Sequence, residues 1–441
     1  MKKLVFLILF ISSFRLSLGQ TKWTYQECIL YALENNLELV NYNYLIDRHK
    51  LNYKSALGNF LPSVSADAGY NINIGKTVDP NTNSIIERDF FSNSYGISGS
   101  LVLFSGFRKF NQLSFEKYNL AATKETVDSE KNRIAFQVLE AYTLHLIQKR
   151  LWEIQNDQVD LAKQELYRIE KNMELGLVSG SELRDAEARL AQDEFLLVQF
   201  HNQQKKSEFS LKRLMNLPVD SSILVEDIDM IANSSGQIPD SLYQQAQVIL
   251  PSIKALNYQL EAAKKSVSTA KSYLSPTLSV YGGINTGYYE TLTNEQGDIV
   301  PFRSQMDNNM RMNYGLSLQI PIFSGFQRRI NIQQSTVARA QAKNNLDIGL
   351  RNLNYEIDEA IIDLTGAEAE YESALKKEES MVIAFRIAER RREEGLINLM
   401  EYFEVKNNLA RASAEVVRTK LQLFMMERTI NFYLTGSLIE E

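Results

Sequence analysis

A five-residue motif occurs twice in this chain and marks the same change of structure each time. Leu103–Phe107 (Leu-Phe-Ser-Gly-Phe) returns 219 positions later as Ile322–Phe326 (Ile-Phe-Ser-Gly-Phe). Before each copy apolar residues alternate with a period of two, which predicts a strand, and after each copy dozens of residues have helical composition. A strand that turns directly into a very long helix joins two different environments. The predicted hinges are Ser105, Gly106, Ser324 and Gly325.

The repetition extends beyond this motif. Leu61-Pro62 and Ser275-Pro276 each open an alternating segment, and Glu174–Leu177 matches Glu393–Leu396 at the same spacing of 219. We therefore interpret the chain as a tandem duplication in which each repeat runs helix, two strands, long helix, tip turn, helix. The first repeat is 20–217, a connector rich in Asp, Ser and Gly is 218–240, the second repeat is 241–436, and the C-terminal tail is 437–441.

Residues 1–19 have the pattern of a signal peptide. Lys2 and Lys3 precede an apolar run that ends at Phe14, and small residues follow at Ser17 and Gly19. The run is too short to span a bilayer as a helix, and no later stretch approaches the roughly 18 apolar residues that would. We expect an exported chain of this kind to be either soluble outside the cytoplasm or a β-barrel.

Charge and cysteine content exclude two classes of protein. The formal net charge is −6 with no basic cluster, which argues against a nucleic-acid partner. The single Cys28 rules out a framework of intrachain disulfides.

The alternating segments predict four strands, two in each repeat. In the first, Val64 and Ala66 share an apolar face while Ser63 and Ser65 share a polar one. Strands of about 10–12 residues with this pattern fit a transmembrane barrel, although half-buried strands of a soluble sheet would alternate too. The polar links Lys76–Ser92 and Tyr289–Asn309 are then outward-facing loops. Four strands do not close a barrel, so we expect three protomers to supply twelve.

The rest of the chain is predicted to be helical. Phe107–Leu175 contains neither Gly nor Pro and predicts a helix on the order of 100 Å long. Phe326–Glu394 predicts a second, with a seven-residue apolar period that begins at Leu350. Both helices are expected to turn at a distant tip, at Gly176 and Gly395. The predicted fold class is a mixed α/β membrane protein, mainly long α-helices in a helical barrel plus four transmembrane β-strands per protomer in a trimeric twelve-stranded barrel.

Several motifs follow one another along the chain in a fixed order and spacing: Trp23–Glu27 before Ala32–Asn36, Leu61-Pro62 and Ser275-Pro276 before strands, Phe-Ser-Gly-Phe at 104–107 and 323–326, and the tips at 176–179 and 395–398. Together they resemble the TolC-like outer membrane efflux protein family over the whole mature length. The resemblance implies a homotrimer in the cell outer membrane, with a large periplasmic part.

The resemblance also implies partners and a function. A periplasmic adaptor (membrane fusion) protein, linked to an inner-membrane pump, is expected to dock at the tips, that is at Gly176, Leu177, Gly395 and Leu396. The implied function is a passive exit duct of a tripartite efflux system, opened at its tip by the adaptor. An exit duct for type I protein secretion fits the same residues. A periplasmic coiled-coil structural protein is the alternative from another class, but it needs neither strands nor duplication.

No catalytic constellation is visible, so the chain is not expected to be an enzyme or to carry a cofactor. His49, His145 and His201 are isolated on predicted helices, and their spacing does not fit a metal site.

Glu401 and Glu404 are the candidate functional carboxylates. Their i,i+3 spacing puts them on one helix face. Acidic residues at the matching positions of the family ring the narrowest point of the periplasmic entrance, and a trimer would place six carboxylates there. The alternative is structural, because Asn398 is placed to cap this helix with Glu401 three residues on. Ser179 and Glu182 repeat that capping pattern at the first tip.

The sequence departs from the family at the entrance lock. The best-known member has a Tyr three residues before the second tip Gly and an Arg two residues after it, where this chain has Arg392 and Ile397. Glu182 matches the acidic partner of that Tyr. We therefore hypothesise a different closing network, with Glu182 and Arg392 as the candidate lock pair.

Overall fold

The computed structural model describes residues 22–78, 83–87, 89–228, 239 and 241–439. The predicted signal peptide and much of the predicted connector therefore lie outside the described residues. The chain forms two compact units. The sheet unit contains Tyr44–Lys124 and Ala255–Ile348, and the helical unit contains the residues up to Asn43, Glu125–Lys254 and the residues from Gly349 onward. Each unit therefore draws on both repeats.

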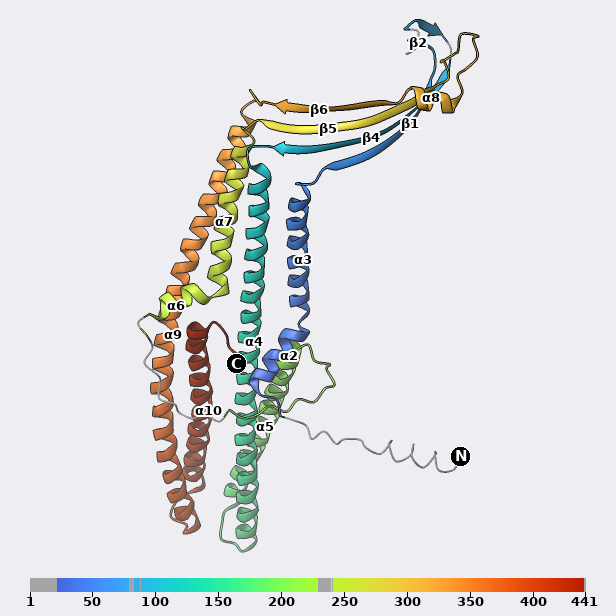
Figure 1. Ribbon diagram of the computed structural model, residues 1–441. Helices are drawn as coiled ribbons and strands as arrows, with labels where there is room; N and C mark the ends of the chain where they lie inside the picture. The colour runs from blue at the N-terminus through green and yellow to red at the C-terminus, as the bar shows by residue number, and fades with distance from the viewer. Residues whose placement is uncertain (1–21, 79–82, 88, 229–238, 240, 440–441) are drawn as a thin grey trace, which may run out of the picture. The chain divides into compact units, whose positions relative to one another are not determined.

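Four strands of the sheet unit form one antiparallel sheet in the order β1-β4-β5-β6 (Figure 1). Their bounds are Ser63–Asn73 for β1, Phe90–Phe104 for β4, Thr277–Tyr289 for β5 and Arg311–Gln319 for β6. The four strands were predicted, but β4 begins inside the segment that was predicted as the link Lys76–Ser92. It does so because β1 keeps pairing to its end, where Asn73 lies opposite Phe90.

The two links between the strands of each repeat have structure of their own. The first holds a small hairpin of β2 (Lys76–Val78) and β3 (Ile85–Glu87), and the second holds α8 (Phe302–Asn308). Gln305 of α8 is fully buried, and its amide donates to Tyr289 O (3.0 Å) and Val300 O (2.8 Å) while accepting from Tyr289 N (2.9 Å). A single side chain thus ties the second link to the end of β5.

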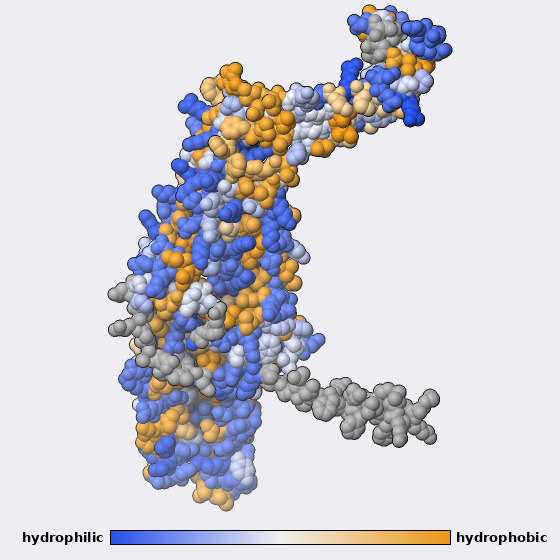
Figure 2. All heavy atoms as spheres, viewed as in Figure 1, coloured by the Kyte–Doolittle hydropathy of each residue, from blue (hydrophilic) through white to orange (hydrophobic). Residues whose placement is uncertain are grey.

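The described residues leave the apolar face of the sheet uncovered. Alternation predicted that Tyr314 and Leu316 share this face, and they are 91% and 67% exposed. Along the edge strand β1 the apolar residues Val64 and Ile72 are 72% and 62% exposed. Figure 2 shows hydrophobic residues gathered where the strands of the sheet unit meet its helices. An apolar face of this kind needs a covering that the described residues of one chain do not provide.

Two helices of 67 residues each, α4 (Arg108–Glu174) and α9 (Gln327–Glu393), dominate the helical content. At 1.5 Å per residue each is on the order of 100 Å long, as predicted. The other helices are α2 Tyr25–Asn35, α3 Leu37–Gly58, α5 Gly180–Leu214, α6 Leu242–Ile249, α7 Pro251–Ser272 and α10 Leu399–Thr435. No described helix is apolar over a stretch long enough to cross a membrane.

The helix predicted to open the first repeat is broken in two at Asn36. The backbone of Asn36 is extended (φ −74°, ψ 120°), and the side-chain oxygen of Asn36 accepts a hydrogen bond from Glu38 N at 2.7 Å. Asn competes with helical hydrogen bonding in this way, so it ends α2 and begins α3.

The first described residues are fixed in the helical unit by backbone and side-chain bonds. Trp23 forms a parallel bridge with Val225, and Tyr142 of α4 donates its hydroxyl to Glu226 O at 2.6 Å. Cys28 on α2 is fully buried beside these residues. Burial raises the pKa of the Cys28 thiol to about 12.

The buried thiol yields a first prediction. A maleimide or a disulfide reagent added to the native protein at pH 8 should leave Cys28 unmodified, because the thiol is inaccessible and protonated. Mass spectrometry after treatment measures this, and the same reaction in denaturant is the control. Rapid modification of the native protein would show that α2 is not packed as described.

Candidate functional site at the helix tips

Both long helices end in the same turn. At the first tip Gly176 N donates to Met173 O (2.9 Å) and Leu177 N to Asn172 O (2.8 Å). The two corresponding bonds recur at Gly395, with lengths of 3.2 and 2.7 Å. This is the Schellman motif, which places the glycine in the left-handed region, and φ is +71° at both glycines. The tip turns were predicted, and glycine is required there because other residues are strained at this φ.

The helix that leaves each turn begins with a side-chain cap. Ser179 Oγ accepts from Glu182 N at 3.4 Å, and Asn398 Oδ1 accepts from Glu401 N at 2.8 Å. Both predicted caps are confirmed. Each satisfies a backbone N–H that would otherwise have no partner at the start of the helix.

A small apolar core joins the two tips. Its buried members are Ile169, Ala186, Ala388, Ile397, Leu399, Tyr402 and Phe403, which come from α4, α5, α9, α10 and the second turn. Ile397 is the residue at which the family lock has an Arg, and here it is only 6% exposed. An apolar contact within one chain therefore occupies the position of that ionic group.

Within one chain Arg392 pairs with Glu165 rather than with the predicted Glu182. The Arg392 guanidinium donates to Glu165 Oε1 on α4, from Nε at 3.1 Å and from Nη2 at 3.0 Å. Arg168 donates to the same oxygen at 2.8 Å. The Arg392 and Glu165 side chains are 12% and 8% exposed, so this charge network is largely shielded from water. Glu165 takes this role because it faces inward on α4, where Arg392 of α9 reaches it.

Glu401 and Glu404 are both exposed, while Tyr402, Phe403 and Lys406 on the same stretch of α10 are buried. The two carboxylates thus share an outward face, as their spacing predicted. Glu401 also lies 3.6 Å from Arg391 of α9, and each of these side chains is 49% exposed. A pair so exposed contributes little to stability. Its effect is to offset part of the negative charge beside Glu404.

Lys406 connects the two repeats below the tips. Its side chain is 1% exposed, and Nζ donates to Gln158 O of α4 at 2.8 Å and to Asp193 Oδ2 of α5 at 3.2 Å. It also lies over the Phe403 ring, 5.4 Å from the centroid. Burial lowers the pKa of Lys406, and the Asp193 carboxylate opposes that shift.

Sequence reasoning missed Glu165 and Lys406, although a signal for both exists. Lys406 continues the stripe of Leu399, Tyr402 and Phe403 at helical spacing, so it stands where an apolar residue is expected. Glu165 stands in the same way four residues before Ile169. A charged residue at a core position predicts a buried partner.

The predicted hinges lie in the sheet unit, between β4 and α4 and between β6 and α9. In both, the glycine and the phenylalanine that follows it adopt left-handed backbone: φ is +63° at Gly106, +62° at Phe107, +58° at Gly325 and +62° at Phe326. Only the glycine was foreseen, since this conformation costs a residue such as Phe about 1 kcal/mol. The phenylalanines meet edge to face in both copies, as the pairs Phe104–Phe107 and Phe323–Phe326.

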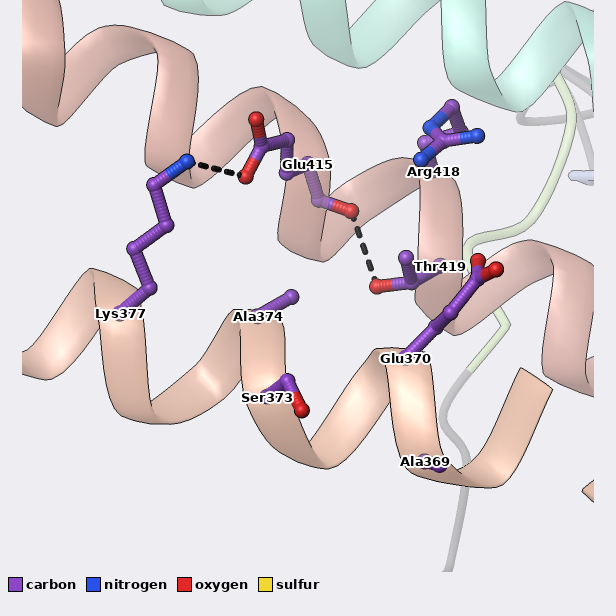
Figure 3. A pocket seen from close by; sticks show the side chains of 8 residues that line it. All are labelled: Ala369, Glu370, Ser373, Ala374, Lys377, Glu415, Arg418 and Thr419. Atoms are coloured by element: carbon purple, nitrogen blue, oxygen red, sulfur yellow. Dashed lines mark hydrogen bonds and ion pairs between the residues drawn. The ribbon is translucent and has the colours of Figure 1, made fainter. Parts of the chain in front are cut away.

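A shallow groove of about 380 Å³ lies between α9 and α10 of the helical unit (Figure 3). Small residues, Ala369, Ser373 and Ala374, leave this space on α9. Lys377 of α9 reaches Glu415 of α10 across it, with 2.7 Å between Nζ and Oε2. The cation and the carboxylate thus satisfy each other, and the groove has the character of a helix–helix contact rather than of a ligand pocket. Among the described residues, His, Cys, Asp and Glu form no cluster of three or more suited to a metal ion.

The fold and the turns at the helix tips together define a class of protein. Two repeats, each with a strand pair and a capped helical hairpin, form a protein whose sheet is open at both edges among the described residues. The sequence profile of the family described as outer membrane efflux protein matches residues 29–217 and 242–435. The chain belongs to this family.

Individual relatives are similar to this chain in sequence or structure over nearly its full length. Outer membrane protein TolC of Vibrio cholerae is 23% identical over 437 residues, which cover 96% of this chain and 94% of that protein. The structure of the Campylobacter jejuni CmeC outer membrane channel superposes with a TM-score of 0.80 at 16% identity, covering 95% of this chain and 87% of CmeC. The open state of the Neisseria gonorrhoeae MtrE outer membrane channel gives 0.76 at 15% identity, covering 94% and 89%. These likenesses confirm the predicted family and its arrangement of strands and long helices.

The buried lysine yields a second prediction. Lys406→Ala should destabilise the protein by about 3 kcal/mol, because it leaves the Asp193 carboxylate without its cation in a largely buried position. Thermal unfolding in detergent measures the change. Lys171→Ala is the matched control, since the Lys171–Glu174 pair is exposed and its loss should cost less than about 1 kcal/mol. Equal effects of the two substitutions would contradict the role given to Lys406.

Proposed function

We propose that this protein is the outer membrane exit duct of an efflux system, a passive channel that takes its energy from a partner pump. One observation carries the proposal. In the part of the chain that the structure describes, the sheet has an exposed apolar face and two free edges, at β1 and β6, so it is complete only inside a closed oligomeric barrel in a membrane. Membership of the outer membrane efflux protein family supports the same conclusion.

Three copies are the number that closes the barrel. Four strands per chain fall short of the eight strands of the smallest membrane barrels, whereas three chains give twelve. Cyclic closure also suits a sheet with two different edges, because β6 of each copy then meets β1 of the next. The long helices would continue from the barrel into the periplasm and complete the duct there.

The tips are the docking surface for a periplasmic adaptor. Leu175, Leu177 and Leu396 flank the two turns and are 72%, 70% and 62% exposed. Exposed leucines on rigid, capped turns offer an apolar contact to a partner. The turns themselves are open to an approaching surface, since a Cβ added at Gly176 or at Gly395 would meet no described atom within 4 Å. The adaptor and the pump enter as the expected partners of the family.

The gate is the contact between the hairpins of the two repeats. Arg392 holds α9 to Glu165 of α4, and Lys406 holds α10 to α4 and α5. Opening would separate these hairpins when the adaptor docks. MtrE has been solved in a form described as its open state, which supports a duct that changes between closed and open forms. In this chain we propose the Arg392–Glu165 pair as the latch.

A third prediction tests the duct and its latch together. Wild-type protein in a planar bilayer should form pores of low conductance, and Arg392→Ala should raise the single-channel conductance several-fold, because Glu165 no longer holds α9. Arg184→Ala is the matched control, since its pair with Glu187 is exposed and lies within one helix.

Two outcomes would contradict this part of the proposal. Absence of any pores from the wild-type protein would count against the duct itself. Unchanged conductance in Arg392→Ala, with pores present, would count against the latch alone.

A fourth prediction concerns charge at the entrance. In a trimer Glu401 and Glu404 would form a ring of six carboxylates, so wild-type pores should prefer cations. Glu404→Gln should lower the cation-to-anion permeability ratio more than Glu401→Gln, because Arg391 already offsets the charge of Glu401. Reversal potentials in a salt gradient measure the ratio. A ratio unaffected by either substitution would show that the carboxylates do not line the pore.

A further inference from the structure

The internal repeat determines how one copy of the sheet meets the next. We infer that β6 pairs with β1 of a neighbouring copy in the register that sets Leu316 opposite the neighbour's Tyr70 and Gln319 opposite the neighbour's Asp67. This inference rests on the proposed closed oligomer and adds the register, which closure alone does not specify.

The pairing within each repeat shows that the repeat holds at single-residue precision. Pro62 and Pro276, before β1 and β5, lie 214 positions apart, while Ser105 and Ser324, after β4 and β6, lie 219 apart. These two shifts convert the observed pair Ser63–Ser100 of β1 and β4 into Thr277–Gln319. That is the pair found between β5 and β6. The two hairpins therefore have the same register.

The same shifts then transfer the contact between the repeats to the free edges. In the centre of the sheet β4 pairs with β5, and Ile97 lies opposite Ile284. The counterpart of Ile97 in the second repeat is Leu316, and the counterpart of Ile284 in the first is Tyr70. A neighbour that continues the repeat around a ring must therefore bring its Tyr70 opposite Leu316.

Side chains and backbone agree with this register. It sets apolar residues against apolar ones on one face, and polar against polar or small ones on the other, as Gln319 against Asp67 and Asn313 against Asn73. Any shift by one residue would mix the two faces, so only shifts by two compete.

Glu290 N donates to Phe91 O, which shows that odd-numbered residues of β4 direct their backbone groups toward β5. Their counterparts on β6 are even-numbered, so Leu316 directs its N–H and C=O to the free edge.

The two hinges give independent support. A Cβ on Gly106 would lie 2.4 Å from Ser275 Cβ and 2.9 Å from Ser272 O, so this glycine receives the segment before β5. Among the described residues nothing lies within 4 Å of the same position on Gly325. Residues 58–61 are the counterpart of Ser272–Ser275 in the first repeat. In a ring that continues the repeat, these residues of the neighbouring copy occupy the space at Gly325.

Disulfide cross-linking tests the register. Gln319 and Asp67 form a non-hydrogen-bonded pair in the inferred register, with Cα atoms about 4.5 Å apart, within the range of a disulfide. Gln319→Cys/Asp67→Cys should therefore give cross-linked dimers and trimers on a non-reducing gel after mild oxidation with copper phenanthroline in outer membranes. Asn313→Cys/Asn73→Cys should do the same. Cys28 remains in place because it is buried, and wild-type protein is the control.

Two matched pairs test the competing shifts. Gln319→Cys/Ser65→Cys and Ser317→Cys/Asn71→Cys lie on the same face but correspond to displacements by two residues in opposite directions. Their Cα atoms would be about 7–8 Å apart in the inferred register, too far for a disulfide. They should cross-link at least tenfold less. Stronger cross-linking of either shifted pair would overturn the register, and so would trimers on a native gel in which neither expected pair cross-links. Only monomers on the native gel would instead refute the proposed function.

The empty space at Gly325 gives a second arm. Gly325→Ala should reduce the trimer fraction several-fold, because the added methyl group meets the neighbouring copy. Gly176→Ala should leave that fraction unchanged, although it imposes the same strain of a positive φ and is equally open in one chain. Equal trimer fractions in the two variants would overturn the assignment of the space to a neighbour.

Discussion

The free edges of β1 and β6 are the constraint on which the rest of the structure depends. Each edge presents a row of backbone N–H and C=O groups that need partners, and in a bilayer water does not supply them. A sheet with an apolar exposed face and two open edges therefore needs both an apolar environment and partner strands from outside the chain. Its completion by identical copies explains why the strands alternate so regularly, why β1 and β6 are exposed on both faces, and why one chain has so little core in its sheet unit.

The duplication provides a simple way to pair the free edges. Because the two repeats have the same strand register, the contact between them serves as the pattern for the contact between copies. At the tips the repeats share the same turn and the same cap, yet their side chains have diverged. Arg392 and Lys406, both from the second repeat, reach Glu165, Gln158 and Asp193 of the first. The backbone thus preserves the symmetry that closure needs, while the charges that differ between repeats are the ones proposed to hold the entrance shut.

Much of the fold was predictable from the sequence, because the signals were local or repeated. The 67-residue helices follow from the absence of Pro, and the tip turns follow from Gly176 and Gly395. The caps at Ser179 and Asn398 follow from side-chain chemistry alone. The break at Asn36 was missed, since one asparagine within helical periodicity is a weak signal. The latch was also missed, because pairing Arg392 with Glu165 rather than Glu182 depends on how α9 packs on α4, and spacing along the chain does not determine that. The positive φ of Phe107 and Phe326 had no signal apart from the glycine before each.

The most direct test of the central claim is a cryo-electron microscopy map of the protein extracted from outer membranes in detergent. Edge-to-edge closure predicts three copies whose sheets join into one barrel of twelve strands, with β6 of each copy hydrogen-bonded to β1 of the next. A map in which β1 and β6 of one chain remain unpaired, or are covered by other parts of the same chain, would contradict it.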